Sequence, residues 1–395
     1  MGPGMLVAAT GVGAGDLVTA SLAGGDLGSA VLWAAWVGAF LKWLLNEGLA
    51  RWQLATGTTL LEGWRQHLGR PIGWFFLIYL ALWTIAVGGS LIKGCAVAGA
   101  ALSGTGPDSL FWWGAAHSMV GLALVMWGRF ALFETLMSVC IGTMFVAVMG
   151  AAAKVGDFDS ADLWRGVFLP SIPDGGLGWT LGVMGGVGGT VTLLSYGYWI
   201  REQGRTEPAD LHSCKVDLAA GYTMTALFGM AMIVIGTQLP PQGKGDGVAV
   251  HIAELLGSQI SPVLGWLFLV GFWAAVFSSL LGVWQGVPYL FADFWRLQKG
   301  QPLPEEGLAV TRSYRGYLIF LSFAPLAVQS LSLGQIAWIY AVLGSLFMPF
   351  LAFTLLYLNG WVQRKHEMAS PWWINLGLLA TLLFFSYQGI LELLG

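Results

Sequence analysis

Two hydrophobic stretches of this chain are interrupted by glycine-rich breaks, at matching places five predicted spans apart. The first break covers residues 11–16 (GVGAGD), and the second covers residues 185–190 (GGVGGT). Unpaired backbone amides and carbonyls are costly in hydrocarbon, so such a break persists only where it lines a cavity. A pair of interrupted spans in corresponding positions of two halves is typical of a transporter's substrate site. We therefore expect a membrane carrier whose solute binds between the two breaks.

The composition indicates a protein that lies within membrane lipid. Of its 395 residues, 56% are hydrophobic and 10% are charged, against roughly 25% charged in an average soluble domain. Most side chains must therefore face lipid or other buried helices. The net charge of −3 and the absence of a basic tail give no reason to expect a nucleic-acid partner. The first apolar run has no basic segment before it, so we expect a span rather than a cleaved signal peptide.

Eleven spans are expected, each long enough to cross about 30 Å of hydrocarbon. They lie near residues 3–24, 28–49, 73–101, 110–127, 130–152, 177–200, 216–238, 259–291, 315–330, 333–358 and 372–393. Lysine and arginine gather in the loops on one side, whereas the other side holds only Lys154, Arg165 and Lys244. Because cytoplasmic loops carry the excess of basic residues, we expect a multi-pass plasma-membrane protein with a cytoplasmic N-terminus and an external C-terminus.

The spans predict a single all-α transmembrane domain over residues 1–395. The longest polar stretches are the size of connectors, so no soluble domain is expected. Residues 1–152 would form a first repeat and residues 177–358 a second repeat of inverted topology, because each holds five spans. Residues 372–393 would be an extra helix. A monomer is expected, because each inverted-repeat unit builds its own cavity.

Several different short motifs are distributed along nearly the whole chain. In chain order they are Gly2-Pro3-Gly4, Ala50-Arg51 with Ala55-Thr56-Gly57 and Glu62, Arg129 with Glu134, Pro173-Asp174-Gly175, Arg201 with Glu202 and Arg205, Ser278-Ser279, and Met348-Pro349-Phe350. In order and spacing they resemble the natural resistance-associated macrophage protein (Nramp) family of divalent-metal transporters. The resemblance implies a LeuT-like 5+5 inverted-repeat fold with the first and sixth helices broken. It also implies secondary transport of a divalent cation, with protons as the coupling ion.

The chain departs from that family at the metal-binding motifs. The family has DPGN at the first break, where its Asp and Asn hold the metal, and MPH at the second. Here the corresponding positions hold Gly13, Ala14, Gly15 and Asp16 at the first break and Thr192, Leu193 and Leu194 at the second. Phe347 stands in place of a span-10 glutamine. Magnesium-transporting relatives lack the methionine but keep the first Asp, so the chain matches neither subgroup. The resemblance carries a metal-ligand role only to Asp16, by position.

Asp16 has two compatible interpretations. A carboxylate at membrane depth is a functional hypothesis, and with the carbonyls freed by the break it suits a hard cation such as Mg²⁺, Mn²⁺ or Ca²⁺. Alternatively, Asp16 caps the second half-helix. The remaining substrate-site candidates are Gly13, Ala14, Gly189, Thr190, Thr192 and Ser195. The three hydroxyls would supply neutral oxygens, unless they bond back to the preceding turn.

Four other charged residues are embedded in predicted spans. Glu47 precedes Arg51 by four residues, which favours a helical ion pair over a proton relay. Lys42 and Lys93 have long stems that can reach an interface. Lys93 also falls near an acidic pair that helps proton movement in the Nramp family, so it would alter a proton pathway or stand in for a bound cation.

The fourth embedded charge is Glu134, at the inner end of the fifth span. Pairing with Arg129 or Arg315 is expected there. Lys93 and Glu134 are the candidates for ion coupling or ion pairing, although neither alone indicates proton transport.

Enzyme motifs are not evident in the sequence. The five histidines lack HExxH or other ligand spacing, and neither glycine run is followed by the lysine of a phosphate loop. We expect no enzyme activity and no cofactor. Three functions remain open: a transporter of a hard divalent cation, a transporter of a small organic or anionic solute on the same scaffold, and a non-transporting sensor or subunit.

Overall fold

The computed structural model describes residues 2–155, 160–186, 189–238, 247–364 and 367–394, and within them all regular secondary structure is helical. In this part of the chain, eight helical segments are long and apolar enough to cross a membrane. Seven of them contain the unbroken helices α3 (Leu32–Thr56), α5 (Arg70–Ser103), α6 (Leu110–Trp127), α7 (Phe130–Ala152), α11 (Leu211–Gln238), α13 (Pro262–Gln298) and α16 (Trp372–Leu394), and the eighth covers residues 177–202. The spans expected at 315–330 and 333–358 are also helical but are not among the eight; they are α14 (Arg312–Phe323) with the 3₁₀ turn η5 (Ala324–Val328), and α15 (Leu333–Leu355). The expected all-α membrane fold is confirmed.

The first and sixth spans are broken where the sequence predicts. The first consists of α1 (Pro3–Thr10) and α2 (Ala14–Leu27). The sixth consists of α9 (Leu177–Gly186), the 3₁₀ turn η3 (Val191–Leu194) and α10 (Ser195–Glu202). Gly189 has φ +79°, which side chains other than glycine rarely adopt. Val187 and Gly188, inside the predicted second break, lie outside the described residues.

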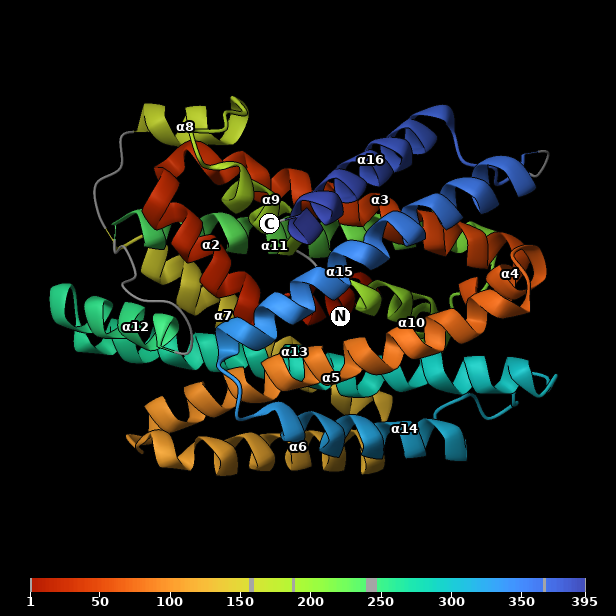
Figure 1. Cartoon of the computed structure of the whole chain (residues 1–395), viewed down its shortest axis with the longest axis horizontal. Coiled ribbons are helices and arrows are strands. Elements are labelled where there is room, and N and C mark those ends of the chain that lie inside the picture. Colours follow the sequence, from red (N-terminus) through yellow and green to blue (C-terminus); the bar gives the residue numbers. More distant parts are fainter. Residues whose placement is uncertain (1, 156–159, 187–188, 239–246, 365–366, 395) are drawn as a thin grey trace.

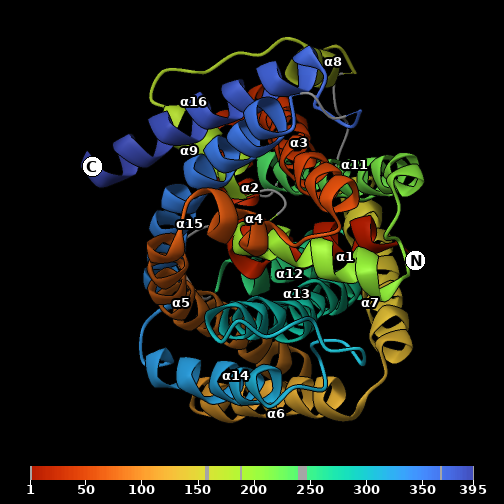
Figure 2. The same cartoon turned by 90° about the vertical axis from the view of Figure 1, so that its right-hand side faces the viewer.

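The broken helices lie in the middle of the bundle (Figure 1). α6 and α14 pack side by side along one edge, while α16 lies at the opposite edge (Figure 2). α1 packs against α11 and α13, and α2 packs against α11 and α9. Both half-helices of the first span are therefore surrounded by protein, which lets their free backbone groups find partners away from lipid.

Small residues allow this close packing. A Cβ atom on Gly236 of α11 would lie 1.9 Å from the main-chain oxygen of Ser21 on α2. One on Gly221 would lie 2.3 Å from the main-chain oxygen of Gly4 on α1. Van der Waals contact between closely approaching backbones is a main source of helix association in membranes.

Three short helices occupy connectors between the expected spans. They are α4 (Leu60–His67), α8 (Ser160–Phe168) and α12 (Val248–Gln259). α4 begins with a capping box, in which the Thr59 hydroxyl accepts from the Glu62 amide and the Glu62 carboxylate accepts from the Thr59 amide. α12 packs against α13. Its apolar face needs that neighbour, which a span-by-span survey of hydrophobicity does not reveal.

Candidate substrate site

The two helix breaks face each other. A Cβ atom on Gly189 would lie 3.1 Å from the Cα of Gly11. One on Gly186 would lie 2.7 Å from the Oδ1 atom of Asp16. Glycine at these positions therefore allows the unwound backbones to meet. Their contact places the predicted residues Gly13, Asp16 and Gly189 in one region of the molecule.

Asp16 lies in the first turn of α2. The helix begins at Ala14 after the N-cap Gly13, so Asp16 is the third helical residue rather than the N-cap that the sequence analysis considered. Its Oδ2 atom accepts a hydrogen bond from the Gly13 amide at 2.9 Å. This bond stabilises the start of the half-helix, while Oδ1 faces Gly186 of the second break. Capping thus uses Oδ2 of the Asp16 carboxylate, and it leaves Oδ1 at the junction, the place where the two helix breaks meet.

A serine of α13 supplies a hydrogen-bond donor to the first break, where the Val12 carbonyl is its nearer acceptor. The Ser279 Oγ atom lies 2.6 Å from the Val12 oxygen and 3.2 Å from the Ala9 oxygen, and is fully buried. Unpaired carbonyls here would be costly, so this hydroxyl supports the break. The sequence analysis used Ser278-Ser279 only as part of the family resemblance and did not assign this role. The presence of a hydroxyl side chain in an apolar span was the one sequence feature that could have indicated this role.

Lys42 of α3 binds the second break, which corrects the expectation that it reaches a membrane interface. Its side chain is 0% exposed. The Nζ atom donates to the main-chain oxygen of Gly185 at 3.0 Å and also to that of Gly189. The Phe385 ring centroid of α16 lies 5.7 Å from Nζ. Because a buried ammonium needs acceptors, the freed carbonyls of the second break hold it in place.

The approach of α3 to α9 brings Lys42 to these carbonyls. A Cβ on Gly38, one turn before Lys42, would lie 2.6 Å from the Met184 oxygen. The glycine therefore lets the two backbones touch. Lys42 also interacts electrostatically with Asp16. The ammonium approaches Gly185 and the carboxylate approaches the adjacent Gly186.

The hydroxyls of the second break differ in their partners. Thr190 accepts a hydrogen bond from the indole nitrogen of Trp83 at 2.9 Å. Thr192 and Ser195 are 3% and 0% exposed, and their hydroxyl oxygens have no hydrogen-bond partner among the described residues. The Thr192 hydroxyl lies against Gly189, whereas the Ser195 hydroxyl lies against Gly286 of α13. Buried polar atoms are normally paired, so these two oxygens are available to a ligand or to water.

The two candidate coupling residues lie apart from these contacts. Lys93 donates to the main-chain oxygen of Gln329, beyond α14, at 3.1 Å. Glu134 accepts a hydrogen bond from the Gln203 side chain, just after α10. In the described part of the chain it has no ion pair with Arg129 or Arg315, the partners that the sequence analysis considered. α10 brings Gln203 next to α7, which the sequence alone does not indicate.

The expected ion pair between Glu47 and Arg51 is present. Both side chains are almost fully buried, and Lys215 of α11 adds a second contact to Glu47 at 3.4 Å. Arg51 also donates to the Met368 oxygen at 3.1 Å. The pair therefore ties α3 to α11 and to the segment before α16, which is a structural role.

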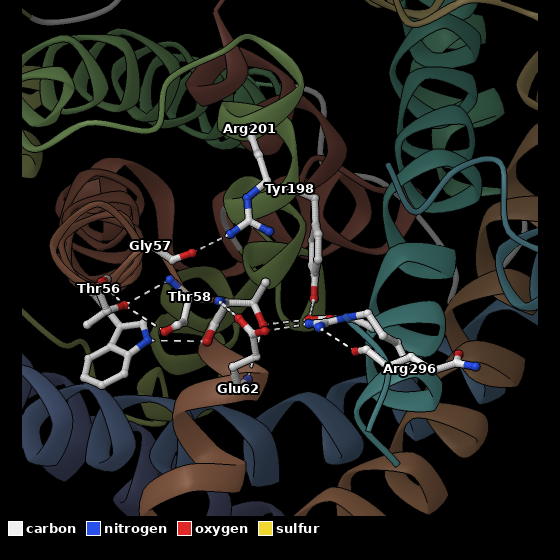
Figure 3. A network of polar contacts seen from close by, with 11 residues as sticks. Thr56, Gly57, Thr58, Glu62, Tyr198, Arg201 and Arg296 are labelled. Atoms are coloured by element: carbon white, nitrogen blue, oxygen red, sulfur yellow. Dashed lines mark hydrogen bonds and ion pairs between the residues drawn. The ribbon is translucent and has the colours of Figure 1, made fainter. Parts of the chain in front are cut away.

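A buried polar network joins the far end of α10 to α4 and α13 (Figure 3). Asp293 is 0% exposed, and its Oδ2 atom accepts from Thr59 at 2.6 Å and from Tyr198 at 2.9 Å. Arg296 binds Asp293 Oδ1 at 2.9 Å through Nε and Glu62 Oε1 at 2.7 Å. The network fixes the half-helix that follows the second break. Sequence analysis did not single out Asp293, because two of its three partners, Thr59 and Tyr198, lie far away in the sequence.

The described residues contain no cluster of three or more His, Cys, Asp or Glu side chains suited to a metal. Phe347, which stands at the position of the family's glutamine, is 3% exposed and stacks on Tyr79 with ring centroids 5.5 Å apart. A cation at the breaks would therefore meet the Asp16 carboxylate, hydroxyls and main-chain oxygens.

Comparisons with known proteins agree with this architecture. Natural resistance-associated macrophage protein-like (Nramp) is the family model that matches, over residues 4–394. The divalent metal cation transporter MntH of Chromohalobacter salexigens is 23% identical over 330 residues, which cover 74% of this chain and 72% of that protein. MntH of Yersinia pestis is 23% identical over 318 residues, covering 75% and 74%.

Solved structures show the same fold. A manganese transporter of Eremococcus coleocola has a TM-score of 0.80 at 18% identity, covering 99% of this chain and 85% of that one. MhsT, solved in complex with L-phenylalanine, has a TM-score of 0.60 at 16% identity, covering 99% of this chain and 97% of that one. The broken first and sixth helices are thus part of a LeuT-like transporter architecture. This chain belongs to the Nramp family.

Proposed function

We propose that this protein is a secondary transporter that moves a divalent metal cation between the two helix breaks. The observation that carries the proposal is the contact between the breaks, with the Asp16 carboxylate at their junction. A carboxylate held in the middle of a membrane bundle is costly unless it has a function or a partner. Family membership supports the transport class, and the MntH relatives and the manganese transporter are named for divalent metals.

The available ligands favour a hard cation such as Mg²⁺ or Mn²⁺. They are oxygens: one from the carboxylate of Asp16, the unpartnered hydroxyl of Thr192 and main-chain carbonyls. No methionine sulfur replaces the family's soft ligand in the second break, where residues 190–195 read TVTLLS. Oxygen ligands suit Mg²⁺ and Mn²⁺ better than softer transition metals.

The proposal includes an N-in, C-out orientation in the plasma membrane, two inverted repeats over residues 1–152 and 177–358, and a monomer. The excess of basic residues in the loops on the N-terminal side supports the orientation. Protons are the proposed coupling ion, with Lys93 and Glu134 as the embedded charges to test. Membership of the Nramp family supports this choice, because the family's transporters are expected to use protons as the coupling ion.

A second candidate is transport of a small organic or anionic solute. Lys42 favours it, because its buried ammonium places a positive charge against the second break. Half-helix N-termini in this kind of fold attract anionic groups. A small acid or amino acid would then pair with Lys42 and approach the amides at the start of α2.

Proteoliposome flux with a panel of divalent cations tests the first candidate. We expect uptake of Mn²⁺ or Mg²⁺ and a fall to about a tenth or less in Asp16→Asn, because that variant loses the carboxylate charge at the junction. Asp26→Asn is the matched control, since Asp26 is exposed on the same helix. Uptake that Asp16→Asn leaves unchanged would remove Asp16 from the site. Stabilisation by amino acids or small acids, with no response to Mn²⁺ or Mg²⁺, would favour the second candidate.

A further inference from the structure

Lys42 is bound in a way that differs from the buried arginines Arg51 and Arg296. Arg51 and Arg296 each contact carboxylates. Among the described residues, Lys42 has no carboxylate oxygen within ion-pair distance, and its hydrogen-bond acceptors are two main-chain carbonyls. Both carbonyls belong to the second break, because Gly185 is in the last turn of α9 and Gly189 follows the helix. The direct hydrogen-bond acceptors of this fully buried ammonium are thus backbone carbonyls, while the Asp16 carboxylate interacts with it from beyond ion-pair distance.

These acceptors are also suited to a free cation. Carbonyl oxygens released by an unwound helix are oxygen ligands, and the C-terminal end of a half-helix carries partial negative charge. α9 ends at Gly186, so its C-terminal dipole points toward the Lys42 ammonium. The ring face of Phe385 adds a further surface that attracts positive charge. The environment of Nζ therefore has the chemistry of a cation site.

We propose that Lys42 is a tethered cation that occupies the cation-binding carbonyls of the second break, so that a substrate cation must compete with its ammonium. This inference rests on the proposed function, because it concerns the same site. It assigns Lys42 as a specificity-determining residue that the family resemblance does not supply. A divalent ion that binds Asp16 and the second break together would have to displace Nζ from Gly185 and Gly189 or bind against its charge.

The competition predicts weak binding of divalent cations by the natural protein. Removal of the ammonium should strengthen that binding, whereas loss of a lysine outside the breaks should not. Lys215 is the control, because its ammonium contacts the Glu47 carboxylate at 3.4 Å and no carbonyl of the breaks is among its hydrogen-bond acceptors in the described residues. Lys42→Met and Lys215→Met nearly keep the length of the side chain and remove its charge.

The first arm of the test measures Mn²⁺ and Mg²⁺ binding to the full-length protein in detergent by calorimetry. We expect the Kd of Lys42→Met to fall by about tenfold or more relative to the natural protein, a coupling of ordinary size between two ligands of one site. The Kd of Lys215→Met should stay unchanged. An equal or higher Kd in Lys42→Met would overturn the inference, while metal binding by the natural protein would leave the proposed function intact.

The second arm does not depend on a metal. Lys42→Ala removes the donor from two carbonyls and leaves space for a small amine, so its melting temperature should fall and should recover in methylammonium chloride. Choline chloride, whose cation is too large and lacks N–H donors, should not restore it. If Lys42→Ala folds only in methylammonium, that recovery is itself the rescue.

The two arms of the test distinguish the tethered-cation role of Lys42 from the proposal that the substrate is a divalent metal. Rescue by methylammonium without any divalent-cation binding would support the tethered cation and reject the metal substrate. Absence of rescue, or equal stabilisation by choline and methylammonium, would overturn the role of Lys42 whatever the protein transports.

Discussion

At the scale of single residues, the hydroxyl of one serine donates a hydrogen bond to the backbone of the first break and that of its neighbour does not. Ser278 and Ser279 are adjacent and both fully buried, but they have different acceptors. The Ser279 hydroxyl reaches the main-chain oxygens of Ala9 and Val12, whereas that of Ser278 bonds to Ala275 of its own helix. The two serines therefore distinguish support of the break from an ordinary hydroxyl contact within α13.

Ser279→Ala should lower the free energy of unfolding by about 1–3 kcal/mol, because carbonyls of the first break lose a buried donor. Thermal unfolding in detergent, monitored by intrinsic tryptophan fluorescence, measures the change. Ser278→Ala is the control and should have little effect, since its acceptor keeps its backbone partner in the helix. Equal effects of the two substitutions would contradict the assigned role of Ser279.

At the scale of elements, the network around Asp293 joins α4, α10 and α13. α10 is only eight residues long, follows the second break and η3, and packs against α1, α3 and α13. Tyr198 connects it to Asp293, while Arg201 connects it to the Gly57 oxygen at 3.0 Å. These bonds make the position of α10 depend on α3, α4 and α13.

Asp293→Asn should destabilise the protein by about 2 kcal/mol, because Arg296 loses a charged partner. In addition, an amide NH2 group replaces one carboxylate oxygen, and in the position of Oδ2 this group cannot accept hydrogen bonds from Thr59 and Tyr198. Chemical unfolding in detergent measures the loss. The control is Asp162→Asn, which breaks an exposed pair with Arg165 on α8 and should change stability little. A change as small as the control's would show that α10 is held by its apolar contacts alone.

At the scale of the whole molecule, the orientation in the membrane can be tested with single cysteines. The natural cysteines Cys95, Cys140 and Cys214 are buried, so they give little background labelling. Thr105 lies in the α5–α6 connection and Thr206 in the α10–α11 connection, and both are exposed. The proposed orientation places the two on opposite sides.

Thr105→Cys should react with a membrane-impermeant maleimide on intact cells, because its loop is proposed to be external. Thr206→Cys should react only after lysis. Gel-shift detection of the label reads out both variants, and labelling of lysed cells controls for reactivity. The reverse pattern would invert the topology, and labelling of both on intact cells would contradict the assignment of spans between them.

The sequence alone determined the membrane environment, the long apolar helices and both breaks. These features follow from local composition, because any long apolar segment is read as a span, and glycine weakens a helix wherever it occurs. The resemblance of the short motifs to those of the Nramp family then indicated the family. Ion pairing between Glu47 and Arg51 was also predictable, since residues four apart share a helix face.

Only the tertiary structure decided what the polar groups of the site contact. Lys42 and Gly185 are 143 positions apart, and the sequence gives no sign that α3 passes the end of α9 closely enough for an ammonium to reach its carbonyls. The same holds for Ser279, which lies 267 positions from the Val12 oxygen that it supports. A buried hydrogen bond depends on distances of a few tenths of an ångström, which are set by packing between helices rather than by the periodicity within any one of them.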